Sequence, residues 1–205
     1  LAEVIEWKRR NPGDDLLTAL IRAEDGGDVL SDTELLDQVN VLFIAGHETT
    51  VNLIGNGLLS LHRNPAQWQR LRDDPAMIPN AVEELLRFEC PVQAVGRTAL
   101  EPLEIGGVAI DKGEIVVALI GAVNRDPEVF DRPDELDVAR KDIPILSFGG
   151  GIHYCLGAQL ARIEAEIVFD ELLRRVPDMQ LPTQDAPVWR PNFTLRGLET
   201  LPATW

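Results

Sequence analysis

The longest periodic segment of this chain limits most strongly how it can fold. Ser31-Asp32-Thr33-Glu34 places a glutamate three residues after a serine, which is the pattern of a capping box that begins a helix. Helical periodicity continues over about residues 32–62, which at 1.5 Å per residue predicts a helix of roughly 45 Å. Its middle, Val39–Gly46, is apolar on nearly every side, so we expect this part to run through the protein interior.

Polar residues interrupt this apolar helix at His47-Glu48-Thr49-Thr50. A polar group in a buried helix is costly unless it has a partner. Two interpretations remain open. Glu48 can lie on a solvated face while Thr49 bonds back to the carbonyl of Ala45, or the two side chains can face a functional site.

A glycine-rich loop with one cysteine is the second informative stretch, Phe148–Gly157. Its three glycines before Cys155 permit a tight turn, and Gly157 permits close approach of the backbone to a ligand. Helical periodicity follows over about residues 158–175, so Cys155 lies just before a helix or in its first turn. The helix dipole there favours thiolate, the form that binds metal. An inert core thiol is the alternative for a single cysteine.

The remaining chain predicts further helices and a small sheet. A helix over about Pro79–Phe88 carries Glu84 and Arg87, which are three residues apart and share a face. Residues 98–122 are strand-like, with a hairpin signal at Gly106-Gly107, and we expect a small mixed sheet there. The fold class is therefore mainly α with a small β component.

Composition and charge exclude several classes of protein. With 205 residues, 45% of them apolar and 26% charged, the chain is long enough for one globular domain over 1–205. A net charge of −15 argues against nucleic acid or an anionic membrane as partner. The two cysteines show no paired spacing, so neither a disulfide framework nor a zinc site is indicated, and a reducing cytoplasm is expected. No apolar run is long enough to span a bilayer.

Three motifs occur in one order along the chain: Ala45-Gly46-x-Glu48-Thr49, Glu84-x-x-Arg87, and Phe148-x-x-Gly-x-x-x-Cys155-x-Gly157. Together they resemble the cytochrome P450 family of haem-thiolate monooxygenases, and most closely its soluble bacterial members. The resemblance covers the whole chain and implies the C-terminal, haem-binding half of that fold. Family chains are longer than this one, because a further half precedes the region that corresponds to Leu1.

The resemblance implies haem b as cofactor, with Cys155 as the proximal ligand of its iron. Arg97 and His153 correspond to partners of the haem propionates. The residues expected to lie against the haem are Phe148, Gly149 and Gly157 in the cysteine loop and Ala45 and Gly46 in the long helix.

Catalytic and substrate residues also follow from the resemblance. Glu48 and Thr49 correspond to the acid and alcohol that relay protons to iron-bound dioxygen, so the implied reaction inserts one oxygen atom into a small organic substrate. The implied pocket consists of Val92, Gln93, Ala94 and Val95 in the extended segment after Cys90-Pro91, with Thr194 and Leu195 in a closing hairpin.

The pair Glu84–Arg87 corresponds to a buried structural ion pair that supports the cysteine loop. Here the sequence departs from the family pattern, because Glu135 stands where an arginine commonly joins the pair. Arg140 is a substitute for that third charge.

An electron donor such as a ferredoxin with its reductase is the implied partner. A second hypothesis is that this polypeptide is a non-catalytic fragment, which needs the N-terminal half, or self-association, to retain haem and bind substrate. A haem-free scaffold is disfavoured, because Cys155, Thr49 and Glu48 are all present.

Overall fold

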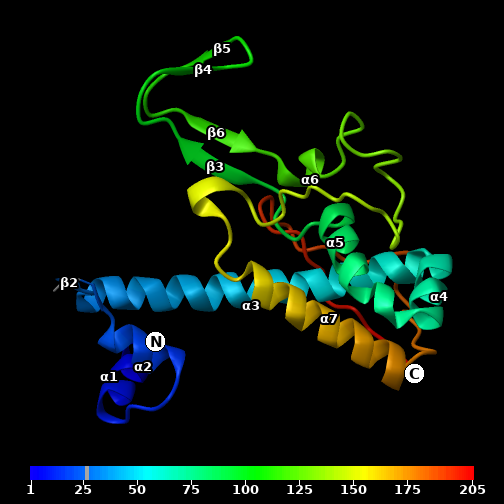
Figure 1. Ribbon diagram of the computed structural model, residues 1–205, viewed down its shortest axis with the longest axis horizontal. Helices are drawn as coiled ribbons and strands as arrows, with labels where there is room; N and C mark the ends of the chain where they lie inside the picture. The colour runs from blue at the N-terminus through cyan, green and yellow to red at the C-terminus, as the bar shows by residue number, and fades with distance from the viewer. Residues whose placement is uncertain (26–27) are drawn as a thin grey trace. The chain divides into compact units, whose positions relative to one another are not determined.

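The computed structural model describes residues 1–25 and 28–205, and these form two compact units. Unit 1 is Leu1–Glu48 and unit 2 is Thr49–Trp205. Helices predominate and the strands are short, which confirms the predicted fold class (Figure 1). Among the described residues, no helix is both long and apolar enough to cross a membrane.

Unit 1 begins with two short helices, α1 (Ala2–Arg10) and α2 (Leu16–Arg22). Lys8 of α1 donates to the carboxylate of Asp15 at 2.7 Å, and the backbone N–H of Thr18 donates to the same group at 2.9 Å. Both contacts hold the pKa of Asp15 below its ordinary value. Asp15 therefore caps α2 and ties it to α1. Two short strands follow, β1 (Glu24–Asp25) and β2 (Asp28–Val29); Gly26 and Gly27, where a turn was predicted, lie outside the described residues.

The longest element is α3 (Asp32–Arg63), which both units share. The predicted capping box begins it. The carboxylate of Glu34 accepts the Ser31 backbone N–H at 2.9 Å and its hydroxyl at 2.7 Å, and Ser31 Oγ accepts the Glu34 N–H at 3.3 Å. These bonds hold the pKa of Glu34 below its ordinary value and satisfy backbone groups that would be orphaned at the helix start.

The apolar middle of α3 is exposed, and the expectation that it would be buried was wrong. Val41, Phe43 and Ile44 each leave 60–63% of their surface accessible. An apolar sequence predicts that a surface should be covered, but it does not say which segment covers it.

The core of unit 2 forms where α5 (Ile78–Phe88) and α7 (Ala158–Arg175) pack together and meet α3 (Figure 1). Gly57 allows the close approach, because a Cβ there would lie 2.7 Å from Cζ of Phe169 and 3.1 Å from Cδ1 of Leu85. Two short helices join α3 to α5: α4 (Pro65–Asp73) and η1 (Pro75–Met77). The buried cluster includes Leu53, Leu61, Leu71, Val82, Leu85, Val138, Ala165 and Phe169.

The strands of unit 2 form two separate antiparallel pairs, so the expected mixed sheet was wrong. One pair is β3 (Val95–Thr98) with β6 (Ile115–Ala118), and the other is β4 (Leu103–Ile105) with β5 (Val108–Ile110). Gly106 and Gly107 have φ angles of 58° and 81° and form the predicted hairpin turn. Short turns reverse the chain, whereas a parallel pair needs a long crossover.

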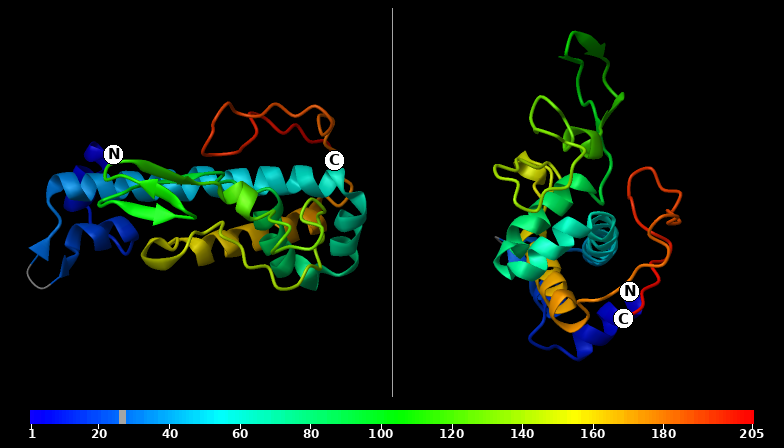
Figure 2. Two further views of the ribbon diagram at one scale, coloured as in Figure 1. Left: turned by 90° about the horizontal axis from the view of Figure 1, so that it is seen from above. Right: turned by 90° about the vertical axis from the view of Figure 1, so that its right-hand side faces the viewer.

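The chain then passes through α6 (Ile120–Val123) and an irregular segment to η2 (Gly151–His153) in the cysteine loop. After α7, the closing segment forms a hairpin in which Trp189 pairs with Leu198. This hairpin lies beside the C-terminal half of α3 (Figure 2), where Nδ2 of Asn56 donates to the carbonyl of Arg196 at 2.9 Å.

A buried charge network joins α5 to the chain that precedes the cysteine loop. Glu84 and Arg87 are both 0% exposed, and their two ion-pair hydrogen bonds measure 2.7 and 2.8 Å. Arg140 Nε donates to both carboxylate oxygens of Glu84 at 3.2 and 3.1 Å, so it supplies the third charge. The Glu135 side chain instead pairs with the exposed Arg132.

The two guanidinium groups outnumber the one carboxylate, and backbone carbonyls complete their hydrogen bonding. These carbonyls belong to residues that follow α6: Asn124, Asp131, Arg132, Pro133 and Glu135. The network thereby fixes the path of an irregular segment that has no regular backbone hydrogen bonding of its own.

We predict that Glu84→Gln destabilises the protein by roughly 3–5 kcal/mol, because it leaves two buried guanidinium groups without a counter-charge. Urea unfolding followed by circular dichroism measures this difference. The matched control is Glu171→Gln, which breaks an exposed pair with Arg174 and should cost at most about 1 kcal/mol. Equal effects of the two substitutions would contradict the structural role of the buried pair.

Candidate active site

The cysteine loop holds Cys155 at the start of α7. Gly149 and Gly151 have φ angles of 69° and 62°, a left-handed conformation that favours glycine. The Cys155 backbone N–H donates to the carbonyl of Phe148 at 2.9 Å, which closes the loop. The helix begins three residues later, at Ala158, and the Cys155 side chain is exposed.

The beginning of the loop is attached to two helices. The guanidinium of Arg162 on α7 lies 4.5 Å from the ring centroid of Phe148 and forms an ion pair with Glu83 on α5. This pairing raises the pKa of Arg162 above its ordinary value, although burial opposes the shift. Glu83 therefore anchors the loop, while the next residue, Glu84, anchors the buried network.

The apolar side chains close to Cys155 in the chain face solvent. Ile152 and Leu156 are 97% and 90% exposed, and Tyr154 and His153 are also exposed. The other thiol differs, because Cys90 is buried and donates to the carbonyl of Val92 at 3.1 Å. Burial raises the pKa of the Cys90 thiol and disfavours its thiolate. The structure thus gives the two cysteines opposite environments.

The predicted residues of the long helix lie at the boundary of the two units. Ala45, Gly46 and His47 are exposed in unit 1, and a Cβ added to Gly46 would meet no atom within 4 Å. The His47 ring stacks on Phe43 with 6.3 Å between centroids. Glu48 is the last residue of unit 1 and Thr49 the first of unit 2, and both are partly buried.

Arg97 lies on β3 with an exposed side chain, and its Nη1 donates to the carbonyl of the preceding residue, Gly96, at 2.8 Å. This local bond holds the guanidinium at the surface. Arg97 and His153 thus each present a cationic or hydrogen-bonding group at a surface of unit 2.

The structure brings together two segments that were predicted to contact substrate. Val92 forms a β-bridge with Leu195, and the Gln93 backbone N–H donates to the carbonyl of Thr194 at 2.8 Å. Asn192 shapes the tip, because its Oδ1 accepts the hydroxyl and N–H of Thr194 at 3.0 and 2.9 Å. These residues form a continuous wall although about 100 positions separate them in the chain.

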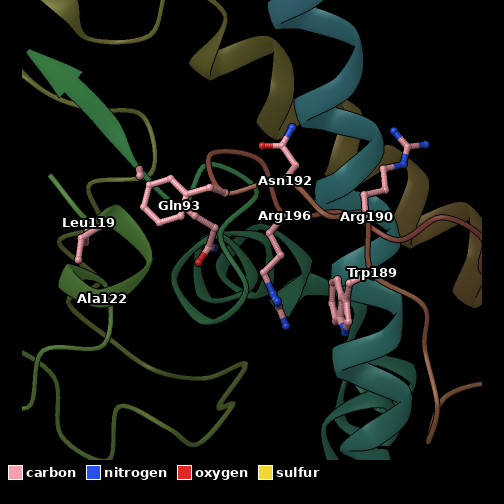
Figure 3. A pocket seen from close by; sticks show the side chains of 9 residues that line it. Gln93, Leu119, Ala122, Trp189, Arg190, Asn192 and Arg196 are labelled. Atoms are coloured by element: carbon pink, nitrogen blue, oxygen red, sulfur yellow. The ribbon is translucent and has the colours of Figure 1, made fainter. Parts of the chain in front are cut away.

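A cavity of about 340 Å³ adjoins this wall (Figure 3). Gln93 and Ala94 belong to its lining, whereas the other four predicted pocket residues do not. Trp189 and Phe193 give it an aromatic side, and Arg190 and Arg196 give it a basic side.

Two residues that support the loop were missed from sequence. Asn124 is buried; its Oδ1 accepts the Leu146 N–H at 2.9 Å and its Nδ2 donates to Ser147 Oγ at 2.8 Å. The Ser147 hydroxyl donates to the carbonyl of Leu86 on α5 at 2.8 Å. Local sequence spacing gives no signal for this role of Asn124, because its partners lie more than 20 positions away in the chain.

The donor set around Cys155 fits haem. Among the described residues, no group of three or more His, Cys, Asp or Glu could hold a bare metal ion. Haem iron needs one protein ligand here, because the porphyrin supplies four, and an exposed thiol ahead of a helix suits that role. The apolar residues beside the thiol suit a flat apolar ring, and Arg97 and His153 suit carboxylates.

Comparison with known proteins gives one family. The cytochrome P450 model matches residues 3–78 and 73–192. Cytochrome P450 107B1 of Saccharopolyspora erythraea is 50% identical over 204 residues, which are 98% of this chain and 50% of that protein. The cytochrome P450 monooxygenase PikC of Streptomyces venezuelae is 44% identical over 208 residues, with coverage of 100% and 50%.

A solved structure agrees. Cytochrome P450 PksS of the Bacillus subtilis 168 bacillaene polyketide synthase is 44% identical and superimposes with a TM-score of 0.93 over 99% of this chain and 53% of that one. The chain spans about half the length of the curated relatives it matches. It belongs to the cytochrome P450 family, whose members hold haem iron through a cysteine thiolate.

Proposed function

We propose that this chain forms the haem-thiolate part of a monooxygenase that inserts one oxygen atom from dioxygen into a small organic substrate. The observation that carries the proposal is the exposed Cys155, held by the Phe148 carbonyl just before α7. Amide groups and the dipole at a helix start stabilise a thiolate, and thiolate ligation favours O–O cleavage. Haem, when bound, supplies the dioxygen chemistry.

The other residues bind, orient or transfer protons. Cys155 Sγ would bind the iron, while Arg97 and His153 would bind the haem carboxylates. Phe148, Gly149 and Gly157 of the loop and Ala45 and Gly46 of α3 would lie against the ring. The chemistry also requires protons in a site from which bulk water is excluded. The Thr49 hydroxyl orients an ordered water there, and the Glu48 carboxyl passes protons from solvent to it.

Substrate is held by the wall described above. Val92, Gln93, Ala94 and Val95 form one side, and Thr194 and Leu195 form the other. The bond between Gln93 N–H and the Thr194 carbonyl supports their joint role. Electrons come from a ferredoxin with its reductase in the cytoplasm.

A second candidate is that the chain needs a further polypeptide to retain haem and substrate. The exposed apolar surface at Val41, Phe43 and Ile44 favours it, because large apolar patches usually mark contacts. The chain covers about half of the relatives. Under this proposal the polypeptide alone is non-catalytic, and either the remaining half of such an enzyme or a second copy completes the site.

We predict that the reduced, haem-loaded chain exposed to carbon monoxide shows a strongly red-shifted Soret band, and that Cys155→Ala abolishes the shift. Cys90→Ala is the control and should retain it, because Cys90 is a core thiol. Alkylation provides a second readout: haem should protect Cys155 from a thiol reagent, and Cys90 should react only after unfolding. A shifted band in Cys155→Ala would sink the ligand assignment, and a shift obtained only after adding the missing half would favour the second candidate.

Thr49→Ala should leave haem and substrate bound but divert electrons to hydrogen peroxide, because the site loses the hydroxyl that orients water. Product formed per electron consumed should fall by about tenfold. Thr49→Ser keeps the hydroxyl and should restore most of the coupling. Unchanged product per electron in Thr49→Ala would count against the relay.

Arg97→Ala should accelerate haem loss by about tenfold, since it removes a charge-assisted bond to a carboxylate. Transfer of haem to an excess of apomyoglobin measures the rate. The control is Arg174→Ala, which removes an equally basic side chain whose partner is Glu171 on its own helix. An off-rate unaltered by Arg97→Ala would remove the propionate role.

A further inference from the structure

Two buried asparagines follow Thr49 on α3 and have no role in the function proposed so far. Asn52 and Asn56 are 4% and 1% exposed, and their spacing of four residues puts them on one helix face. Asn56 Nδ2 donates to the Arg196 carbonyl at 2.9 Å, whereas Asn52 Nδ2 and Asn56 Oδ1 have no hydrogen-bond partner among the described residues. Burying an amide is costly unless it forms hydrogen bonds. The hydrogen bond from Asn56 to the Arg196 carbonyl therefore indicates what this side chain does.

The partner of that bond, Arg196, is attached at four points. Its backbone N–H donates to the Pro91 carbonyl at 2.8 Å, and its own carbonyl accepts from Asn56. Its guanidinium forms an ion pair with Glu89 and lies 3.7 Å from the centroid of the Trp189 ring. Figure 3 labels both Arg196 and Trp189 at the pocket. Arg196 thus joins α3, the segment after α5 and the closing hairpin.

The next residue brings the hairpin into direct contact with the same helix face. A Cβ added to Gly197 would lie 2.1 Å from Oδ1 of Asn52, a distance that no side chain tolerates. Glycine at this position therefore lets the backbone pack on Asn52. Asn52 and Asn56 thus offer a donor and an acceptor on the same helix face that meets the hairpin.

The residues just before Arg196 are the hairpin part of the substrate wall. Leu195 pairs with Val92, and the Thr194 carbonyl accepts from Gln93. We propose that Asn56, with Asn52 and Arg196, is a positioning residue that holds Thr194 and Leu195 at a fixed place relative to the α3 turn beginning at Thr49. Its consequence for substrate rests on the proposed function; its consequence for the hairpin does not.

Hydrogen exchange tests the hairpin part without haem. Asn56→Leu keeps the branching of the side chain at Cγ but removes the donor, so exchange at the amides of Gln93 and Arg196 should accelerate by about tenfold. The amides of Ala99 and Gly113, bonded in the distant strand region, should be unchanged. The matched control is Asn64→Leu, which removes a side-chain hydrogen bond from the residue that follows α3 to the Ser60 carbonyl of that helix.

Gly197→Ala provides a second test, because the added Cβ would overlap the Asn52 side chain, so that either the hairpin or this side chain must move. It should accelerate the same two amides. If Asn56→Leu leaves Gln93 and Arg196 as protected as in Asn64→Leu, the positioning role is overturned. Far-ultraviolet circular dichroism establishes that each variant retains its helices.

Two azole probes test the substrate part in the haem-loaded protein. Imidazole reaches only the iron, whereas phenylimidazole also contacts the pocket wall. In Asn56→Leu the affinity for phenylimidazole should fall by about tenfold while the affinity for imidazole stays the same. Equal changes for both probes would overturn a role in the wall. Failure of either probe to shift the Soret band of the unsubstituted protein would reject the proposed function instead, and the exchange experiment would still decide the positioning role.

Discussion

The buried charges of Glu84, Arg87 and Arg140 are the interaction on which the rest of unit 2 depends. Three charges taken out of water are costly unless they are fully bonded. Here the ion pairs, together with carbonyls from residues 124–135, satisfy them. These bonds hold residues 124–135, which form no strand and no long helix, in one conformation. Asn124 and Ser147 extend this order to the residues before Phe148.

The ordered path explains how an exposed thiol can be held in place. Cys155 gains no burial from its own loop, and its position follows from the Phe148 carbonyl, from the start of α7 and from the attachment of Arg162 to Glu83. Adjacent glutamates on α5 therefore have different roles: Glu84 pairs with Arg87 in the interior, and Glu83 pairs with Arg162 to hold the loop. The exposed apolar residues around the thiol are the surface that a flat apolar cofactor would cover.

The wall that we propose to hold substrate has a separate support. It is formed by two segments of distant sequence, and it depends on backbone bonds at Gln93 and Arg196 and on the buried amide of Asn56. Because this support is attached to α3 just after Thr49, the same helix carries both the proposed proton relay and the proposed anchor of the wall.

The sequence by itself determined the local features of this protein: the capping box at Ser31–Glu34, the glycine turn at Gly106-Gly107 and the helix that follows the cysteine loop. Each depends on residues within a few positions of one another, so spacing predicts it. Only the tertiary structure showed that Asn124 supports the loop and that Asn56 reaches the hairpin, and it confirmed that Arg140 completes the charge network. It also corrected the burial of the middle of α3 and the mixed sheet. The physical reason is that a buried polar side chain or an apolar face is stable only against a partner, whereas the path of the chain decides which residue becomes that partner.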